Sequence, residues 1–135
     1  MLRKTIILKA PPEHVWKFLT EKDRLATWFH EGENDLEKDG VYAVVTNTLG
    51  KEGTRLCWGR VVEFDPPNTL VHTFTHQWLD GAETVCRWTL TRIDQGTILS
   101  LEHSGFENLP DRFEQVANHD VGWDEHFARL RKVVA

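Results

Sequence analysis

The sequence predicts an α+β fold in which an antiparallel sheet is covered by a long C-terminal helix. Short strand-like runs separated by turn residues fill positions 41–106, two short helical segments follow a first strand, and residues 110–134 form one amphipathic helix. A sheet with one apolar face needs a cover, and the long helix supplies it. The length of 135 residues suits one domain over 1–135.

The first third of the chain is predicted to hold a strand and two helices. Residues 2–9 have high β-propensity. A helix begins at Pro12, which suits the first helical position, and Glu13 lies at the positive end of the helix dipole. Thr20 is the expected N-cap of a second short helix over 21–29. The polar segment 30–40 is turn-rich, with room for one short extended piece.

The middle of the chain is predicted to be an antiparallel meander of about six strands. Gly59 interrupts one of them and indicates a bulge. Cys57 and Cys86 lie in strands and are expected to be small buried hydrophobes. The clearest strand segments are 41–47, 54–64, 69–79, 83–93 and 97–106.

The register between the third and fourth of these strands sets the inward face. A three-residue loop over 80–82 would place His76 opposite Cys86, Phe74 opposite Trp88 and His72 opposite Leu90. This choice sets apolar residues opposite one another, whereas a slip by one residue would turn every side chain to the other face. The expected inward residues are His72, Phe74, His76, Cys86, Trp88 and Leu90, continued by Leu99, Leu101 and His103.

The C-terminal helix carries one continuous stripe at helical spacing: Phe113, Val116, Asp120, Trp123, Phe127, Leu130 and Val134. Asp120 interrupts this stripe, and a buried carboxylate is costly without partners. It is either hydrogen-bonded to a histidine or tryptophan N–H, or it anchors the polar end of a ligand in a cavity. Gly122 costs ~1 kcal/mol relative to alanine, which a close approach, a bend or plain packing would offset.

Composition excludes several function classes. The net charge is −5 and the basic residues are scattered, so no nucleic-acid partner is expected. No apolar run approaches the ~20 residues of a membrane span, and the N-terminus does not match a signal peptide. Two cysteines are too few for a disulfide framework, which favours a cytoplasmic location. Six tryptophans indicate a large aromatic interior or a groove.

No metal or cofactor site is expected. His72 and His76 lie four residues apart on one strand, so their Cβ atoms are ~13 Å apart, too far for one zinc ion. His76 and Cys86 can lie side by side, but two ligands do not make a site. Nucleophile, phosphate-loop and dinucleotide motifs do not appear. Acid–base work by inward histidines with Asp120 stays open, although each histidine alone is better explained as structural.

Several segments together resemble a known family: "APPEHVWKFLTEKDRLATWF", "LEKDGVY", "GRVVEFDPPNTLVHTF", "GTILSLEHSGF" and "HDVGWDEHFARL". In order and spacing they are similar to the START-like (SRPBCC) superfamily, in the branch named for activator of heat-shock protein 90 ATPase homologues. The resemblance implies a helix-grip (START/Bet v-like) fold, a curved antiparallel sheet around the long C-terminal helix with two short helices closing one end.

The resemblance also implies a cavity between sheet and helix that binds lipids, polyketides or similar apolar molecules. With Asp120 as a polar anchor, the ligand-binding residues expected by position are Trp28, His72, Phe74, His76, Trp88, His103, Trp123 and Phe127. Phe127 stands where leucine is commoner in the family, and the sheet is richer in histidine and tryptophan. The identity of the ligand therefore cannot be inferred from the family.

Three functions remain open from the sequence. The first is binding of a small hydrophobic or aromatic molecule. The second is a cyclase or dehydratase-type enzyme using a histidine–carboxylate pair, without assigned catalytic residues. The third is a co-chaperone-like protein-binding module, which the start of the first strand at residue 2 disfavours because no separate chaperone-binding domain precedes it. The oligomeric state is not predicted.

Overall fold

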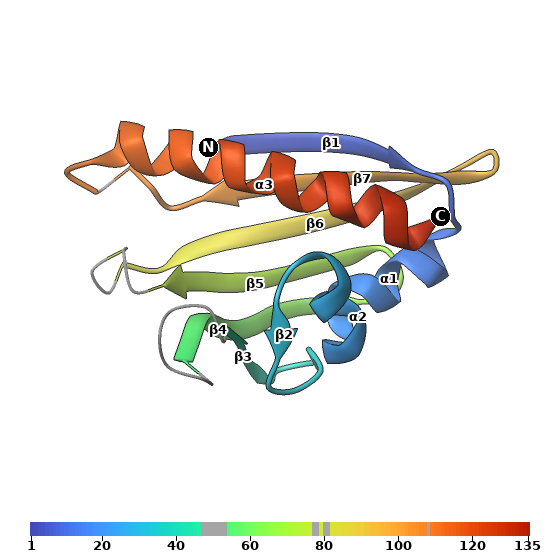
Figure 1. Ribbon diagram of the computed structural model, residues 1–135, viewed down its shortest axis with the longest axis horizontal. Helices are drawn as coiled ribbons and strands as arrows, with labels where there is room; N and C mark the ends of the chain where they lie inside the picture. Colours follow the sequence, from blue (N-terminus) through green and yellow to red (C-terminus); the bar gives the residue numbers. More distant parts are fainter. Residues whose placement is uncertain (47–53, 77–78, 80–81, 108) are drawn as a thin grey trace.

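The computed structural model describes residues 1–46, 54–76, 79, 82–107 and 109–135 (Figure 1). The elements, in chain order, are β1 (Leu2–Leu8), α1 (Pro12–Thr20), α2 (Lys22–Trp28), β2 (Glu31–Gly32), β3 (Val41–Thr46), β4 (Thr54–Asp65), β5 (Thr69–His76), β6 (Thr84–Ile93), β7 (Gly96–Ser104) and α3 (Arg112–Val134). This order confirms the predicted α+β class.

The sheet has seven strands in the order β1-β7-β6-β5-β4-β3-β2, and every neighbouring pair is antiparallel. The first strand therefore pairs with the last one. Helix α3 lies across one face of the curled sheet, and α1 and α2 lie near its C-terminal end (Figure 1). This is the predicted helix-grip arrangement. Within the described residues, no helix is long and apolar enough to cross a membrane.

The predicted register of β5 against β6 is wrong by four residues. His72 lies opposite Cys86 and Leu70 opposite Trp88, because β5 already ends at His76 and β6 begins at Thr84. The connection is longer than the three residues assumed. A shift by an even number leaves each side chain on its predicted face. The inward assignment consequently holds for His72, Phe74 and Trp88, all of which are buried.

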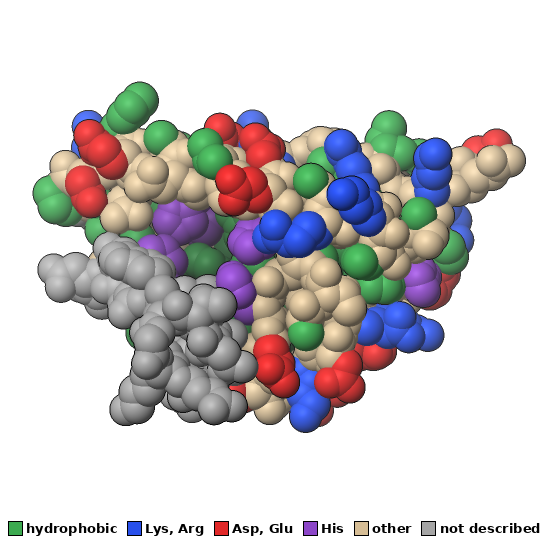
Figure 2. Space-filling view, viewed as in Figure 1, with side chains coloured by type: hydrophobic (Ala, Val, Ile, Leu, Met, Phe, Trp, Pro, Cys, Tyr) green, Lys and Arg blue, Asp and Glu red, His purple; other side chains and the backbone are tan. Residues whose placement is uncertain are grey.

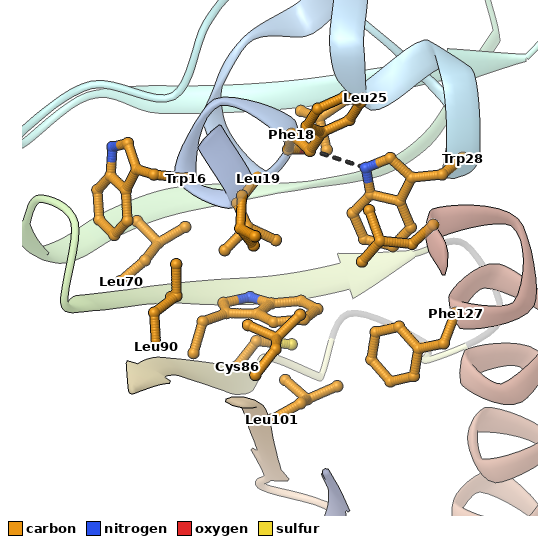
Figure 3. Close-up of a cluster of buried hydrophobic side chains, with 14 of the residues drawn as sticks. Trp16, Phe18, Leu19, Leu25, Trp28, Leu70, Cys86, Leu90, Leu101 and Phe127 are labelled. Atoms are coloured by element: carbon orange, nitrogen blue, oxygen red, sulfur yellow. Dashed lines mark hydrogen bonds between the residues drawn. The ribbon is translucent and has the colours of Figure 1, made fainter. Parts of the chain in front are cut away.

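Aromatic side chains fill the end of the interior that α1 and α2 cover (Figure 3). Trp28 stacks on Phe127 at 6.3 Å between ring centroids and meets Trp88 edge-on at 6.3 Å. The indole N–H of Trp28 donates to Phe18 O at 2.8 Å, so this buried donor is satisfied. Each large side chain buried here contributes roughly 1.5–3 kcal/mol. Four described tryptophans are buried, as the composition predicted: Trp16, Trp28, Trp88 and Trp123.

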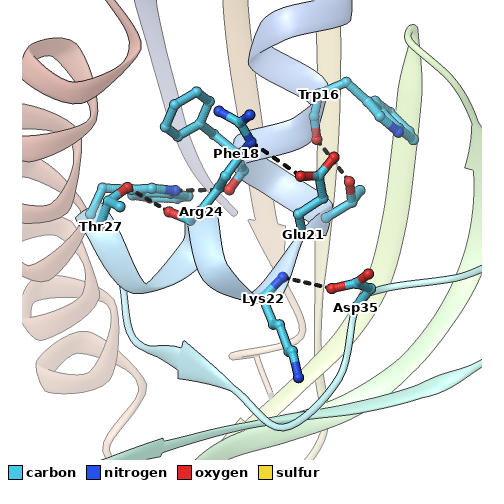
Figure 4. A network of polar contacts seen from close by, with 9 residues as sticks. Trp16, Phe18, Glu21, Lys22, Arg24, Thr27 and Asp35 are labelled. Carbon is cyan, nitrogen blue, oxygen red and sulfur yellow. Dashed lines mark hydrogen bonds and ion pairs between the residues drawn. The ribbon is translucent and has the colours of Figure 1, made fainter.

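The junction of α1 and α2 is fixed by polar contacts (Figure 4). The prediction that Thr20 caps α2 is wrong, because its hydroxyl donates back to Trp16 O at 3.0 Å inside α1. Glu21 is the N-cap residue and its side chain accepts from Arg24 Nε at 3.1 Å. The backbone N–H of Lys22 donates to Asp35 Oδ1 at 2.9 Å. These bonds hold Trp28, at the end of α2, over the sheet.

The predicted stripe of α3 holds in its C-terminal half and at Val116, which is half-buried against the core. Trp123, Phe127 and Leu130 are buried, whereas Phe113 is 78% exposed. In the N-terminal half the residues that line the pocket are polar, among them Gln115 and His119. These pocket-lining positions are rotated by about one residue, roughly 100°, from the apolar stripe. The spacing of apolar residues predicts which side chains pack in a core. It does not predict polar side chains that border an open pocket.

Gly59 is not a bulge, because it pairs with Tyr42, and the irregularities of β4 lie nearer Leu56 and Val62. A Cβ at Gly59 would lie 2.2 Å from Thr73 O, so the close approach of β5 requires glycine.

We expect Gly59→Ala to lower the free energy of unfolding by at least about 2 kcal/mol. Gly122→Ala is the control, since nothing lies within 4 Å of its added Cβ. Its helix propensity gain of up to ~1 kcal/mol should raise stability. Urea unfolding of both variants measures the difference, and equal midpoints would contradict it.

Candidate ligand-binding pocket

A pocket of about 590 Å³ opens between the N-terminal half of α3 and the sheet. Figure 2 shows histidine side chains gathered around a hollow beside α3. Its wall comes from the end of α2, from β4 and β5, and from α3. The lining residues are Phe29, His30, Cys57, Phe74, His76, Asp111, Gln115, Asn118, His119, Gly122, Trp123 and His126.

Three aromatic rings make the apolar part of this wall. Phe29 stacks on Trp123 at 5.6 Å between centroids with a 12° angle between the rings. Phe74 lies 6.1 Å from Trp123 on the sheet side. Gly122, one residue before Trp123, leaves open space where a side chain would project. The pocket thus offers aromatic faces and a helix surface without a side chain.

His76 and His119 form an imidazole pair in the wall. His119 Nδ1–H donates to Gln115 O at 2.6 Å, which leaves Nε2 of the neutral ring as an acceptor. His76 Nε2 lies 2.9 Å from it and therefore donates its proton to His119. Burial, with the nearby His119 second, lowers the pKa of His76 to about 4. Burial also lowers the pKa of His119, against the hydrogen bond to Gln115. Both rings are neutral near pH 7.

A second polar group lies where α2 ends. Arg129 donates through Nε to Trp28 O at 3.1 Å and through Nη2 to His126 Nδ1 at 2.6 Å. The neutral His126 ring therefore carries its proton on Nε2. Burial, followed by the charges of His30 and Arg129, lowers the pKa of His126 to about 4. Burial and Arg129 also lower the pKa of His30.

His103 and Trp123 belong to a closed hydrogen-bond chain behind the pocket. Trp123 Nε1–H donates to His103 Nδ1 at 3.1 Å, so Nε2–H of the neutral ring donates to Thr84 Oγ1 at 2.8 Å. Thr84 then donates to Phe74 O at 2.6 Å. Burial, together with the neighbouring histidines, lowers the pKa of His103 well below its usual value. Its role is to satisfy a buried indole.

His72 has the same role for a second tryptophan. Trp88 Nε1–H donates to His72 Nε2 at 2.9 Å, so the ring proton sits on Nδ1. That nitrogen lies 2.9 Å from Tyr42 Oη and 3.0 Å from Thr73 O. Burial lowers the pKa of His72 to about 4. Both fully buried histidines are therefore neutral hydrogen-bond partners of indoles.

The structure divides the residues that the sequence placed in one cavity. Phe74, His76 and Trp123 line the 590 Å³ pocket. Trp28, His72 and Trp88 border an inner void of only about 30 Å³, the room of one water molecule. His103 and Phe127 are packed into the core. The aromatic rings under α1 and α2 interlock, so this end of the interior is filled.

The prediction that Asp120 faces the interior is wrong. Its side chain is 48% exposed and forms an ion pair with Lys4 of β1. Lys4 also bonds Asp124 Oδ1 at 2.8 Å, one turn further along α3. These pairs tie α3 to the edge strand β1. The neighbouring His119 lines the pocket instead, together with other residues of α3.

Sequence reasoning missed most of the α3 wall and the His30–His126–Arg129 group. The one signal for the wall was Gly122, a glycine inside a helix with no turn to explain it. Cys57 lines the pocket but is buried, and burial raises the pKa of its thiol well above the usual value. In the described part of the chain no three His, Cys, Asp or Glu residues are placed to hold a metal ion. The pocket has room for a small molecule. Its neutral imidazoles can accept or donate a proton.

Comparison with known proteins identifies relatives by fold. The family described as "Activator of Hsp90 ATPase homolog 1-like protein" matches residues 9–135. Protein MLL2253 from Mesorhizobium loti superposes with a TM-score of 0.84 at 24% identity, covering 98% of this chain and 95% of that one. CalU16 from Micromonospora echinospora gives 0.75 at 22%, covering 98% and 73%. PFC0360w from Plasmodium falciparum, an HSP90 activator, gives 0.74 at 17%, covering 98% and 94%. No curated protein matches.

Proposed function

The chain belongs to the family of activator of Hsp90 ATPase homolog 1-like proteins, and we propose that it binds a small, largely apolar molecule between α3 and the sheet. The observation that carries the proposal is the pocket of about 590 Å³ beside Gly122. This volume lies within the range of ligand sites, roughly 300–1,000 Å³. The cytoplasmic location and the single domain over 1–135 stay predictions.

The wall chemistry supports an apolar ligand with a few polar atoms. Phe29, Phe74 and Trp123 supply ring faces, and aromatic contacts of this kind favour flat or hydrocarbon bodies. The polar positions are neutral imidazoles and amides, with Asp111 near the start of α3. A glycine at position 122 sacrifices helix stability and gains pocket volume. A chain that needed only a packed core would be more stable with a larger residue there.

A second candidate function is acid–base catalysis at the same pocket. The Nε2 atoms of His76 and His119 lie 2.9 Å apart, so one ring can pass a proton to the other. The histidine–carboxylate pair expected from the sequence has no support, because Asp120 pairs with Lys4. Mass spectrometry of a bound ligand after incubation separates the two functions. An unchanged mass supports binding alone, and a product that disappears with His119→Gln supports catalysis.

The proposed binding is tested by titrating the protein with a panel of fatty acids, flavonoids and aromatic polyketides while following indole N–H signals by NMR. We expect a saturable shift of the Trp123 signal, because this ring lines the pocket. Trp16 is the internal control, since it packs against Phe64 at 5.3 Å in the filled core. Shifts confined to Trp58, which is partly exposed and lines a different, outer groove, would contradict the pocket as the site.

A further inference from the structure

We propose that the ligand of this pocket is an apolar molecule that carries one anionic oxygen group, such as a carboxylate, sulfonate or phenolate, and that this group binds at the His30–His126 side of the pocket beside Arg129. The inference rests on the proposed function and adds the chemical class of the ligand and its orientation.

Hydrogen bonding fixes which atom His126 presents. Nδ1 lies 3.4 Å from Trp28 O and 2.6 Å from Arg129 Nη2. Because a guanidinium can only donate and its contact is much the shorter, Nδ1 accepts from Arg129 and the ring carries its proton on Nε2. Within the described part of the chain, this Nε2–H has no hydrogen-bond partner, although the ring lines the pocket. A donor that lines a ligand cavity in this way is suited to an acceptor oxygen of the ligand.

The positive charge of Arg129 lies next to the same imidazole, and no carboxylate of the described residues pairs with it. None of the ion pairs formed between described residues includes Arg129, and its hydrogen-bond partners among them are a backbone carbonyl and an imidazole. Glu31 and Glu125, next in sequence to His30 and His126, are exposed. In Figure 2 basic side chains lie beside a histidine at the edge of the hollow. The guanidinium therefore polarises His126 Nε2–H toward an anion.

His30 completes this end of the pocket. Its ring meets that of His126 edge-on at 5.3 Å between centroids and that of Phe29 at 4.8 Å. The positive charge of Arg129 disfavours protonation of both histidines. An anion placed between the two imidazoles would remove that repulsion and accept their N–H groups. The apolar body would then extend along Phe29 and Trp123, which stack on each other.

Two dyes with the same aromatic body test the proposal. 8-Anilinonaphthalene-1-sulfonate is an anion, and N-phenyl-1-naphthylamine lacks the sulfonate. Fluorescence titration gives both dissociation constants for the wild-type chain and for Arg129→Gln. We expect the affinity ratio of the anion to the neutral dye to fall about tenfold in Arg129→Gln. Arg131→Gln, which removes the same charge from an exposed position of the same helix, is expected to leave the ratio unchanged.

The affinity ratio of the two dyes distinguishes loss of the anion site from loss of folding, because an unfolded variant would lose affinity for both dyes together. Equal weakening of both dyes by Arg129→Gln, or an equal fall of the ratio in Arg131→Gln, would overturn the anion site and leave the apolar pocket standing. Failure of the wild-type chain to bind either dye, or binding that survives Gly122→Phe, would overturn the proposed pocket function as well.

Discussion

Lowering the pH from 7 to 5 is expected to reduce the free energy of unfolding by about 2 kcal/mol from His72 alone. Burial lowers the pKa of His72 to about 4 in the folded chain, against about 6.5 in the unfolded chain. Between these values the unfolded chain binds more protons, so stability rises with pH and is lost as the pH falls. Protonation would also place a donor on Nε2, where Trp88 already donates.

His103 acts in the same direction, because its pKa is lowered well below the usual value and Trp123 donates to its Nδ1. The more exposed histidines at the pocket, His30, His76, His119 and His126, contribute less through solvent screening. Urea unfolding at pH 7, 6 and 5 gives the slope. His72→Gln, whose amide oxygen can accept from Trp88, should reduce that slope by about one proton between pH 6 and 5. A free energy of unfolding that stays level from pH 7 to 5 would contradict the assignment.

Gly122→Phe is expected to weaken binding of any pocket ligand by roughly tenfold or more. The added ring projects from the middle of the α3 wall into space where nothing lies within 4 Å of the first added carbon. Stability should not fall, because phenylalanine has a better helix propensity than glycine and the ring meets Phe29, Phe74 or Trp123. Loss of binding without loss of stability separates this variant from core substitutions, which cost about 2–5 kcal/mol.

Val121→Phe is the matched control for this substitution. Val121 is the neighbouring residue of the same helix, and its side chain is 57% exposed. The same ring there lies outside the pocket and should leave the dissociation constant unchanged. Isothermal titration with the best ligand from the NMR panel measures both variants. Equal affinities of Gly122→Phe and the wild-type chain would show that the ligand binds elsewhere.

The sequence was sufficient for the order of elements and for the inward face of the sheet. Alternation in β5 and β6 determines which side chains share a face, and this survived a four-residue register error because the error was even. The error itself came from the connection after His76, whose length no pairing rule determines. Phe74 and Trp88 were therefore placed on the correct face but opposite the wrong partners.

The pocket was harder to predict than the fold, for two physical reasons. Hydrophobic spacing detects side chains that pack, whereas the α3 wall consists of Gln115, His119, Gly122 and His126, which border open space. The roles of the histidines depend on partners distant in sequence, as with Trp88 for His72 and Trp123 for His103. Only the folded structure shows that His72 and His103 accept hydrogen bonds from buried indoles, whereas His76 and His119 line the pocket.

The most direct test of the proposed pocket is a crystal structure of the protein with the tightest ligand of the NMR panel. We expect the ligand to lie between α3 and the sheet, with its apolar body against Gly122, Phe29 and Trp123. A ligand on the outer face of the sheet, in the groove of about 380 Å³ beside Trp58, would contradict it.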